Sequence, residues 1–486
     1  MQVNKNFKLR QVYLAALLLS IAGANVVQAE EALPEYTFLD AVKGGKNMSS
    51  FRLRYENVEQ SGLQPLTTVG SAQNPTAGRD LKDANGLTLR SLIGWQTAPF
   101  HNFSFAGQII NVTKFQDDFN DSTNSTLING VSNQPNKVEY AKIIDPDYTN
   151  VNQLYVDWTG IKNTRLRAGR QQTNLDNVRF IGDIAYRQVM QVFDGVSVLN
   201  KSLPDTEVFL AHYESVNQIT TEKRSDGALE IANLKYRISP TESIVGYGYF
   251  SGFDDLGLAR SWFGNAAANG GLAAGKNGNA NNDADQSNKT VGLRLDGVHP
   301  FTPDWKGLYT AEYAKQTDYQ GGDNRIDAHY YKLGGGAAYG NFSLRVDQEL
   351  LSSNNGRYAF QTPFGTNHLS QGWVDKFLVT PLEGIQDSFI TAAYRYGDFA
   401  FFADYHVLRS DKDFNTVGGG FGDKFGTEWN TAVTYNYSKN IMGKIEYGRF
   451  SEDDHYALLP AANTEVGNRG RIRDTEKLWL TAMYTF

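Results

Sequence analysis

Residues 49–58 read SSFRLRYENV, a run in which apolar and polar side chains alternate. Phe51, Leu53 and Tyr55 fall on one face of an extended chain, because successive side chains of a strand point to opposite faces. The charged residues between them, Arg and Glu together, fall on the other face. This period of two predicts a strand that has one apolar face and one charged face.

The same alternation recurs along the chain. Runs of this kind, separated by turn-forming residues, are typical of strands, and we expect about eighteen of them. They lie near residues 49–58, 87–96, 103–112, 151–159, 164–170, 192–199, 206–213, 229–237, 242–250, 289–296, 306–316, 329–339, 342–350, 387–396, 399–408, 428–437, 441–450 and 475–486.

The connections between these strands alternate in length. Residues 59–86 and 113–150 are long connections, residues 97–102 and 160–163 are short ones, and the pattern continues along the chain. Outer-membrane barrels combine short periplasmic turns with long extracellular loops and an even number of strands. The predicted fold is therefore all-β, a transmembrane antiparallel up-and-down β-barrel of about eighteen strands, with an uncertainty of about one hairpin.

Both ends of the chain fit this fold. Residues 1–29 hold basic residues, an apolar run and a small-residue exit, which predict a secretory signal peptide and a mature chain that begins near Glu30. Residues 477–486 alternate again and end in an aromatic residue, which resembles the signal that the outer-membrane assembly machinery recognises. We therefore expect residues 30–486 to form one barrel in the outer membrane of a Gram-negative bacterium, with membrane lipid and that machinery as partners.

Composition excludes several classes of protein. The chain has no Cys, which removes disulfide scaffolds, thiol catalysis and Cys-ligated metal sites. Its 46 basic and 53 acidic residues give a net charge of -7, so no attraction to nucleic acid is expected. A mean hydropathy of -0.45 excludes a helical membrane protein. We expect no cofactor and no metal.

The width of the predicted barrel indicates a pore. A barrel of about 16 to 18 strands leaves an aqueous channel, whereas one of about eight strands is filled by side chains. Residues 30–48, which precede the first strand, are too few for the globular plug domain of a TonB-dependent receptor. Active gated uptake by that mechanism is therefore not expected.

The side chains expected to face the lumen include more Arg than any other charged type. Guanidinium groups bind carboxylate or phosphate with paired donors, so rings of Arg favour anions. Mixed Arg and Glu ladders, as in general diffusion porins, would instead neutralise one another, and composition weighs the two interpretations equally. The excess of basic residues in the first third of the chain slightly favours a pore that passes anions. The predicted lumen set includes Arg52, Arg54, Arg90, Asp157, Arg165, Arg167 and Arg345.

Longer sequence runs add a family resemblance. Residues 151–206, which contain GRQQTNLDNVRFIG at 169–182, resemble the alginate export family of outer-membrane porins, as do FRLRYENV at 51–58 and GWVDKFLVTPLEGIQD at 372–387. The resemblance covers nearly the whole mature chain. It implies a barrel of about eighteen strands with an arginine-rich constriction, partly covered by loops, that passes an acidic polysaccharide. Matching motif positions imply that the constriction includes Arg54, Asp157, Arg170, Arg179, Arg187 and Asp194.

Other chemistry is weaker in this sequence. Asp404 and His406 share a face of one predicted strand, but no motif places a Ser beside them. A polar pair in the lumen is therefore favoured over the catalytic site of a barrel hydrolase. We expect that the protein is not an enzyme. Asp283 and Asp285 lack the terminal Glu of an EF-hand loop and are expected in an external loop. Residues 174–177 are expected to hold a turn.

The sequence thus predicts an outer-membrane porin that gives passive, anion-selective passage to acidic, saccharide-like solutes of the alginate export type. The first alternative is a general diffusion porin for small polar nutrients that has no polyuronate specificity. The second alternative is a surface-exposed barrel whose loops bind a partner.

Overall fold

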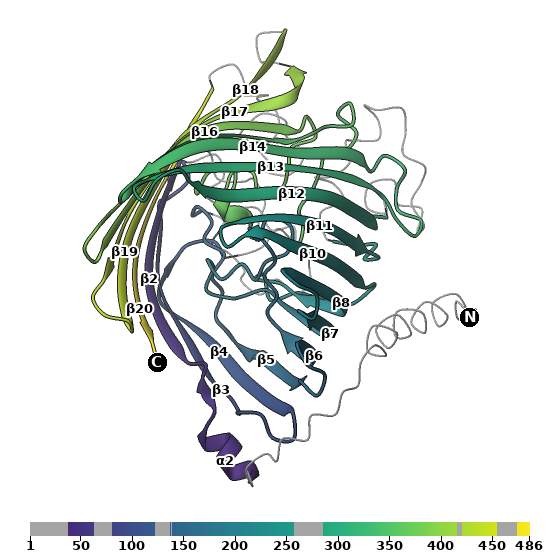
Figure 1. Cartoon of the computed structure of the whole chain (residues 1–486). Helices are drawn as coiled ribbons and strands as arrows, with labels where there is room; N and C mark the ends of the chain where they lie inside the picture. The colour runs from purple at the N-terminus through teal and green to yellow at the C-terminus, as the bar shows by residue number, and fades with distance from the viewer. Residues whose placement is uncertain are drawn as a thin grey trace, which may run out of the picture.

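The computed structural model describes residues 37–62, 80–121, 137, 139–256, 285–415, 420–453 and 474–486. In these residues one sheet holds twenty strands, of which β1 (Lys46–Asn47) and β9 (Lys223–Arg224) are two-residue segments and the other eighteen form the wall of a barrel (Figure 1). The predicted number of strands is therefore confirmed. The predicted signal peptide, residues 1–29, and the expected mature start at Glu30 lie outside the described residues.

The wall strands follow one another around the barrel in chain order, and each pairs antiparallel with its neighbours. Their bounds are β2 (Ser50–Gln60), β3 (Ala84–Gln96), β4 (Phe103–Asp118), β5 (Tyr148–Trp158), β6 (Thr164–Gln171), β7 (Val192–Asn200), β8 (Thr206–Asn217), β10 (Leu229–Ser239), β11 (Glu242–Ser251), β12 (Asn288–Pro300), β13 (Trp305–Asp318), β14 (Asp327–Tyr339), β15 (Phe342–Leu351), β16 (Ile385–Tyr396), β17 (Phe399–Asn415), β18 (Phe421–Asn436), β19 (Ile441–Glu452) and β20 (Thr475–Thr485).

The first and last wall strands close the barrel. Strand β2 pairs with β20 in an unbroken antiparallel register from Ser50 opposite Thr485 to Gln60 opposite Thr475. Closure satisfies the backbone groups of strands that would otherwise form exposed edges, which lipid does not tolerate. The transmembrane antiparallel barrel predicted from the alternation is therefore confirmed, and this architecture places the chain in the outer membrane.

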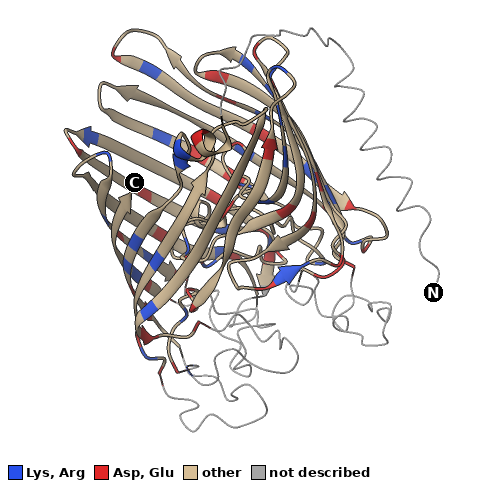
Figure 2. Ribbon diagram, turned by 90° about the horizontal axis from the view of Figure 1, so that it is seen from below, with Lys and Arg blue, Asp and Glu red and all other residues tan. Residues whose placement is uncertain are grey.

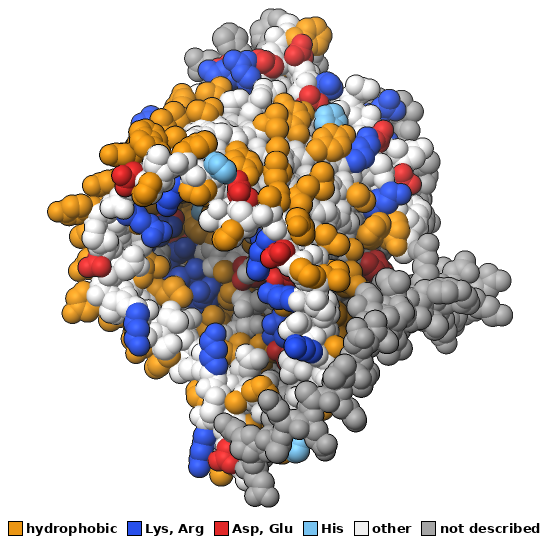
Figure 3. Space-filling model, in the orientation of Figure 1, with side chains coloured by type: hydrophobic (Ala, Val, Ile, Leu, Met, Phe, Trp, Pro, Cys, Tyr) orange, Lys and Arg blue, Asp and Glu red, His pale blue; other side chains and the backbone are white. Residues whose placement is uncertain are grey.

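The alternating sequence orients each wall strand. In β2, Leu53 is 41% exposed on the outside of the wall, whereas Arg52 and Arg54 are 6% and 3% exposed on the inside. Figure 3 shows hydrophobic side chains spread over the outer surface of the strands. The outer surface is apolar because it faces hydrocarbon, and the alternate residues of each strand are thereby turned towards the lumen.

One connection that the sequence predicts to be a long loop is mostly strand in the structure. Residues 409–427 were expected to be a long connection, yet β17 and β18 continue through most of them. An ion pair of 2.7 Å between Arg409 Nη1 and Asp423 Oδ2 joins the two strands there. The rings of Phe414 and Phe425 also stack, with centroids 5.6 Å apart. These cross-strand pairs stabilise a hairpin that local composition does not reveal.

A short helix, α2 (Phe38–Lys43), lies at the short-turn end of the barrel (Figure 1). Thr37 caps its N-terminus, and the Phe38 ring packs edge-on against Phe100 with centroids 5.9 Å apart. Trp95 Nε1 donates to the backbone oxygen of Val42 at 2.8 Å. Within the described part of the chain, no helix is long and apolar enough to cross a membrane.

The lumen has two chemically different halves. Two connections fold inside the barrel from its long-loop end: loop A, residues 172–191 between β6 and β7, and loop B, residues 352–384 between β15 and β16. In the long-loop half, buried apolar side chains of the wall pack against both loops, whereas charged side chains predominate near the short turns. The apolar cluster includes Phe180, Phe193, Tyr213, Leu229, Tyr249, Tyr330, Phe360 and Phe364.

The outward face of β14 offers a test of the membrane-spanning wall. Leu333 is 54% exposed and lies at the middle of this strand. We predict that Leu333→Arg destabilises the folded barrel by about 2–4 kcal/mol, because a charge then sits near the bilayer midplane. Urea unfolding of protein refolded into phospholipid vesicles measures the change.

The matched control is Leu333→Ile, which keeps the surface apolar and should unfold close to the urea concentration of the native chain. Equal stability of Leu333→Arg and Leu333→Ile would show that this face does not contact hydrocarbon.

Candidate functional site in the barrel lumen

Loops A and B pack against each other inside the ring of strands (Figure 1). Gly182 N donates to Phe364 O at 2.9 Å, and Thr366 N donates to Val178 O at 2.8 Å. The two loops therefore share backbone hydrogen bonds although about 180 residues separate them in the chain. They meet because both fold into the lumen of the same barrel. Together they form one inserted body that narrows the long-loop half of the lumen.

Arg52 of β2 holds loop A with its whole guanidinium group. Its Nη1 donates to Ala185 O at 2.7 Å, its Nη2 donates to Arg187 O at 2.5 Å, and its Nε donates to Gln188 Oε1 at 3.0 Å. Gln188 in turn donates to Thr88 Oγ1 of β3 at 2.7 Å. The planar fork of donors lets a single Arg side chain bind three acceptors of one loop segment.

Arg54 and Arg90 bind the same segment. Arg54 Nη1 donates to Tyr186 O at 2.6 Å, and its guanidinium lies 4.4 Å from the centre of the Tyr186 ring. Arg90 Nη1 donates to Ala185 O at 3.2 Å and to Arg187 O at 3.4 Å. Arg52, Arg54 and Arg90, called the arginine triad below, are 6%, 3% and 4% exposed. In the described part of the chain no carboxylate forms an ion pair with any of them.

Arg187, in the same loop segment, binds two carboxylates. Its Nη2 lies 3.2 Å from Glu56 Oε2 and 3.2 Å from Asp145 Oδ2. Asp145 also accepts a hydrogen bond of 2.9 Å from the backbone nitrogen of Gln188. Burial opposes the charge of Arg187, but Asp145 and Glu56 outweigh burial and raise the pKa of this guanidinium above its ordinary value. Glu56 and Asp145 are therefore engaged by Arg187.

Arg179 joins loop A to loop B. It is 2% exposed, and its Nε donates to Glu349 Oε1 of β15 at 2.9 Å. The remaining donors reach Thr362 Oγ1 at 3.1 Å, Asn367 Oδ1 at 2.8 Å and Gln371 Oε1 at 3.0 Å. Burial opposes its charge, but Glu349 outweighs burial and raises the pKa of Arg179 above its ordinary value. This side chain is a fully bonded link between the loops and the wall.

Loop B is also fixed to the opposite wall. His368 Nδ1 and Asp375 Oδ1 lie 2.8 Å apart, and Lys477 Nζ of β20 lies 3.3 Å from Asp375 Oδ2. The His368 ring stacks on Tyr186 of loop A. Burial raises the pKa of Asp375, but the charges of His368 and Lys477 outweigh it and hold this pKa below its ordinary value. The two loops thus meet at this pair of stacked rings, and the ion pair with Lys477 fixes loop B to β20.

Other predicted lumen residues pair near the short turns. Arg167 binds Asp157 through two hydrogen bonds of 2.6 and 2.8 Å and lies 3.6 Å from the centre of the Tyr155 ring. Arg345 binds Asp347 through two hydrogen bonds of 2.7 and 2.6 Å. Arg165 lies on the same face of β6 as Arg167. Arg167 and Arg345 are therefore neutralised, whereas no carboxylate forms an ion pair with Arg165 in the part of the chain that the structure describes.

Arg170 and Asp194 lie on the outside of the wall. They pair with each other across β6 and β7, and Arg170 is also opposite Leu154, which is 61% exposed. Arg170 binds Asp194 through hydrogen bonds of 2.7 and 3.0 Å. The sequence predicted both residues in the constriction; the register instead places them on the outward face. The reason is that Arg170 is an odd number of positions from Arg167 and so points to the other side of the strand.

Several site residues were not predicted from the sequence. Asp145, Gln188 and the backbone oxygens of residues 185–187 complete the contacts of loop A. Most of their partners are more than 90 residues away in the sequence. Arg52 and Ala185, for example, are 133 positions apart. A run of Arg, Gln and Asp without period two indicates a polar loop. No local feature of the sequence indicates that this loop folds into the barrel.

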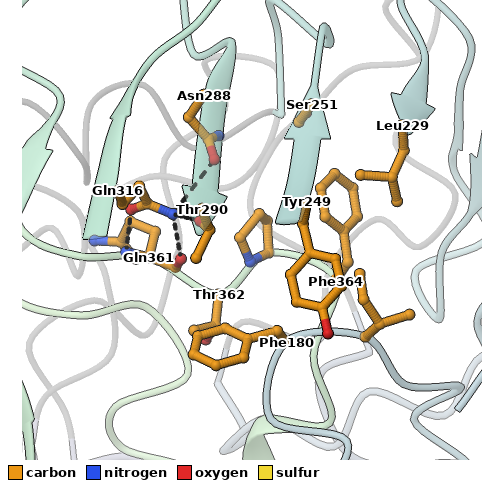
Figure 4. A pocket seen from close by; sticks show the side chains of 12 residues that line it. Phe180, Leu229, Tyr249, Ser251, Asn288, Thr290, Gln316, Gln361, Thr362 and Phe364 are labelled. Atoms are coloured by element: carbon orange, nitrogen blue, oxygen red, sulfur yellow. Dashed lines mark hydrogen bonds between the residues drawn. The ribbon is translucent and has the colours of Figure 1, made fainter. Parts of the chain in front are cut away.

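A small cavity lies where the loops meet β10–β13 (Figure 4). Phe180 and Tyr249 contribute rings to its lining. Gln316 Nε2 donates to Thr290 Oγ1 at 2.9 Å and to the backbone oxygen of Gln361 at 3.0 Å. The cavity is polar on one side and aromatic on the other, which suits ordered water beside an apolar contact.

His406, which the sequence paired with Asp404, bridges two carboxylates. Its Nδ1 lies 2.8 Å from Asp387 Oδ2, and its Nε2 lies 3.2 Å from Asp404 Oδ1. Nδ1 is thus hydrogen-bonded within the wall and Nε2 lies at ion-pair distance from Asp404, and neither contact involves a hydroxyl nucleophile. Among the described residues, no group of three or more His, Asp or Glu side chains is arranged to hold a metal ion.

Charge is distributed unevenly inside the barrel. Figure 2 shows basic and acidic positions interspersed along the strands. Figure 3 shows a hollow in the face towards the viewer, with Lys and Arg side chains along its walls. The lumen therefore combines paired charges of both signs with a basic excess around loop A.

Solved structures resemble the whole fold. Pseudomonas aeruginosa OpdQ is 13% identical, with a TM-score of 0.59, over 92% of this chain and 98% of that chain. Acinetobacter baumannii OccAB4 is 12% identical, with a TM-score of 0.57, over 90% and 97%. The outer membrane protein OpdK of P. aeruginosa is 10% identical, with a TM-score of 0.56, over 90% and 98%. At these identities the likeness concerns the fold. No family model and no curated protein matches the sequence.

The link made by Arg179 can be tested by substitution. We predict that Arg179→Met costs about 3–5 kcal/mol locally, because it leaves Glu349 buried without its partner. Amides of loop B should then exchange faster with deuterium, as measured by hydrogen-exchange mass spectrometry on the refolded full-length protein.

The double variant Arg179→Met with Glu349→Gln removes the unpaired charge and should recover part of the lost protection. If the single and double variants exchange alike, the ion pair does not hold the loops together.

Proposed function

We propose that this protein is a passive outer-membrane channel that favours anionic, saccharide-like solutes, in the manner of the alginate export type. The observation that carries the proposal is the arginine triad. Its three guanidinium groups are buried in the lumen and bonded to uncharged acceptors, among them three backbone oxygens of loop A. A pore wall with unneutralised Arg attracts anions and repels cations.

The chemistry of Arg favours carboxylates in particular. A guanidinium group stays charged at any physiological pH and offers parallel N–H donors that match the two oxygens of a carboxylate. Arg52 already uses this fork on two backbone oxygens of one loop segment. A uronate residue presents the same two-oxygen geometry together with a negative charge, so we propose acidic saccharides as the solute class.

Arg165 supports the same direction of selectivity. It faces the lumen near the short turns and forms no ion pair in the described part of the chain, whereas Arg167 is paired with Asp157 and Lys444 of β19 with Glu446. In our proposal these side chains guide an anion between the periplasmic mouth and loop A. Arg179 and Arg187, which the resemblance implies for the constriction, act by shaping the loops around the path.

A general diffusion porin remains the second candidate, and one observation favours it. Most lumen cations outside the triad have a carboxylate partner, as in Arg167 with Asp157, Arg345 with Asp347, or the 2.9 Å pair of Arg294 with Glu312. Such pairs give a polar wall with little net charge. On this alternative the triad serves only to fix loop A, and the pore passes small polar nutrients of either charge.

Reversal potentials in planar bilayers distinguish the two candidates. Under a salt gradient we predict anion selectivity for the native protein. Arg54→Gln and Arg90→Gln should each lower the anion to cation permeability ratio by about tenfold, because a charge at ~6 Å in water changes the local concentrations of anions and of cations by about threefold each, in opposite directions.

The outward residue Arg170 supplies the matched control, since Arg170→Gln removes one Arg from the wall without altering the lumen. Its selectivity should equal that of the native protein. A native channel without anion preference would contradict the proposal and favour the general porin.

Blocking by a polyanion tests the solute class. We predict that oligogalacturonate, added to one side of the bilayer, interrupts single-channel current at lower concentration than a neutral oligosaccharide of equal length, because its carboxylates bind the arginines. Equal block by the charged and neutral chains would contradict the assignment of acidic saccharides while leaving anion selectivity intact.

A further inference from the structure

Aromatic side chains ring the outer surface of the barrel at its short-turn end. They lie opposite one another on neighbouring strands, and several of them are 39–53% exposed: Trp305, Tyr339, Phe342, Tyr394, Phe401 and Tyr484. Trp95 and Phe105, which are 39% and 44% exposed, continue this aromatic girdle over β3 and β4. Such girdles mark the level at which lipid headgroups meet acyl chains. The girdle therefore gives the height of the periplasmic lipid surface on the barrel.

Helix α2 packs against this girdle from outside the barrel (Figure 1). The Phe38 ring meets the Phe105 ring edge-on, with centroids 6.3 Å apart. The hydrogen bond from Trp95 Nε1 to Val42 O fixes the other end of the helix to the girdle. Ala41, between these two contacts, is fully buried. The helix therefore covers outward-facing side chains of the wall and lies at the height of the lipid surface.

The uncovered side of α2 combines apolar and basic groups. Phe38 and Leu39 are 51% and 60% exposed. Lys43 is exposed and lies one helical turn after Leu39 on the same side, and Lys46 of β1 is exposed as well. Neither lysine forms an ion pair in the described part of the chain, whereas the Asp40 carboxylate is used to cap the helix. Two large apolar side chains thus lie beside two unpaired cations.

A lipid surface matches this combination. Phe38 contacts a girdle residue, so the exposed rings and aliphatic groups of α2 are continuous with the surface that faces hydrocarbon. Interfacial segments insert large apolar residues at the acyl boundary and place lysines among the headgroups. The long stem of a lysine can lie along apolar surface while its ammonium group reaches the phosphates. Anionic phospholipids attract such lysines.

We propose that α2 is an interfacial anchor that binds anionic phospholipids of the periplasmic leaflet. Phe38 and Leu39 enter the acyl boundary, and Lys43 and Lys46 bind headgroup phosphates. The anchor holds the chain just before β2, the strand that closes the barrel with β20. The inference concerns the membrane and not the solute, so it stands or falls independently of anion selectivity.

Spin labels on the refolded full-length protein test the position of α2. The chain has no Cys, so each variant carries a single label. Leu39→Cys reports on α2, Leu333→Cys on the lipid-facing wall, and Asp304→Cys on an exposed short turn. The vesicles contain phosphatidylethanolamine and phosphatidylglycerol. We expect the label at Leu39 to collide more often with oxygen, which is concentrated in lipid, than with a water-soluble nickel complex, as the label at Leu333 does. The reverse preference, as at Asp304, would place α2 in water and overturn the proposal.

Removal of both lysines tests the role of charge. The spectrum of the label at Leu39 has separate components for lipid-bound and released helix. Lys43→Gln with Lys46→Gln should lower the ratio of bound to released helix by about 25-fold, because each Lys near an anionic surface contributes a factor of about five. Lys162→Gln with Lys201→Gln removes two lysines from another part of the same rim and should leave the ratio unchanged.

The lipid supplies an independent measurement of the same charge. Vesicles of phosphatidylcholine alone should release the helix to about the extent that the double lysine variant does, since either change removes one side of the attraction. A ratio that ignores both changes would overturn the binding of anionic headgroups, even with the label at Leu39 in lipid. A heat-dependent shift on gels verifies that each variant forms the barrel.

Discussion

The structure depends on the pairing of β2 with β20. Within lipid no water is available for an unpaired backbone N–H or C=O, so a sheet survives there only when its first strand meets its last. The unbroken register from Ser50 to Gln60 against β20 meets this requirement. Once the ring is closed, every strand must present alternate residues to lipid and to the lumen. Arg52 and Arg54 therefore point inward because Leu53 points outward.

The width of the ring sets the next requirement. Eighteen strands enclose more space than wall side chains fill, and loops A and B occupy much of the long-loop half. The loops bring apolar side chains such as Phe180 and Phe364 to pack against the wall, and they bring Arg179 to bind Glu349. The charged contacts fix the position of each loop, and the apolar contacts stabilise it. The arginine triad lies where loop A meets β2 and β3.

The sequence predicts those parts of this arrangement that are local or periodic. Alternation and connection length give the strand count, closure and the inward phase of Arg52, Arg54 and Arg90, because each follows from neighbouring residues. The same alternation predicts that Arg170 points to the opposite face from Arg167. The motif resemblance instead implied that Arg170 faces the lumen, and the register shows that it does not. The partners of the triad could not be predicted, because Ala185 is 133 positions from Arg52 and only the folded loop brings them together. Strand length at β17 and β18 likewise depends on contacts such as Phe414 with Phe425.

A crystal structure of the full-length protein grown with glucuronate is the most direct test of a lumen built around an anion site. It should show the uronate carboxylate within hydrogen-bond distance of at least one of the predicted lumen arginines, such as Arg54, Arg90 or Arg165. A uronate that is absent from the lumen, or that is held there without any contact to an arginine, would contradict the assignment of this lumen to acidic solutes.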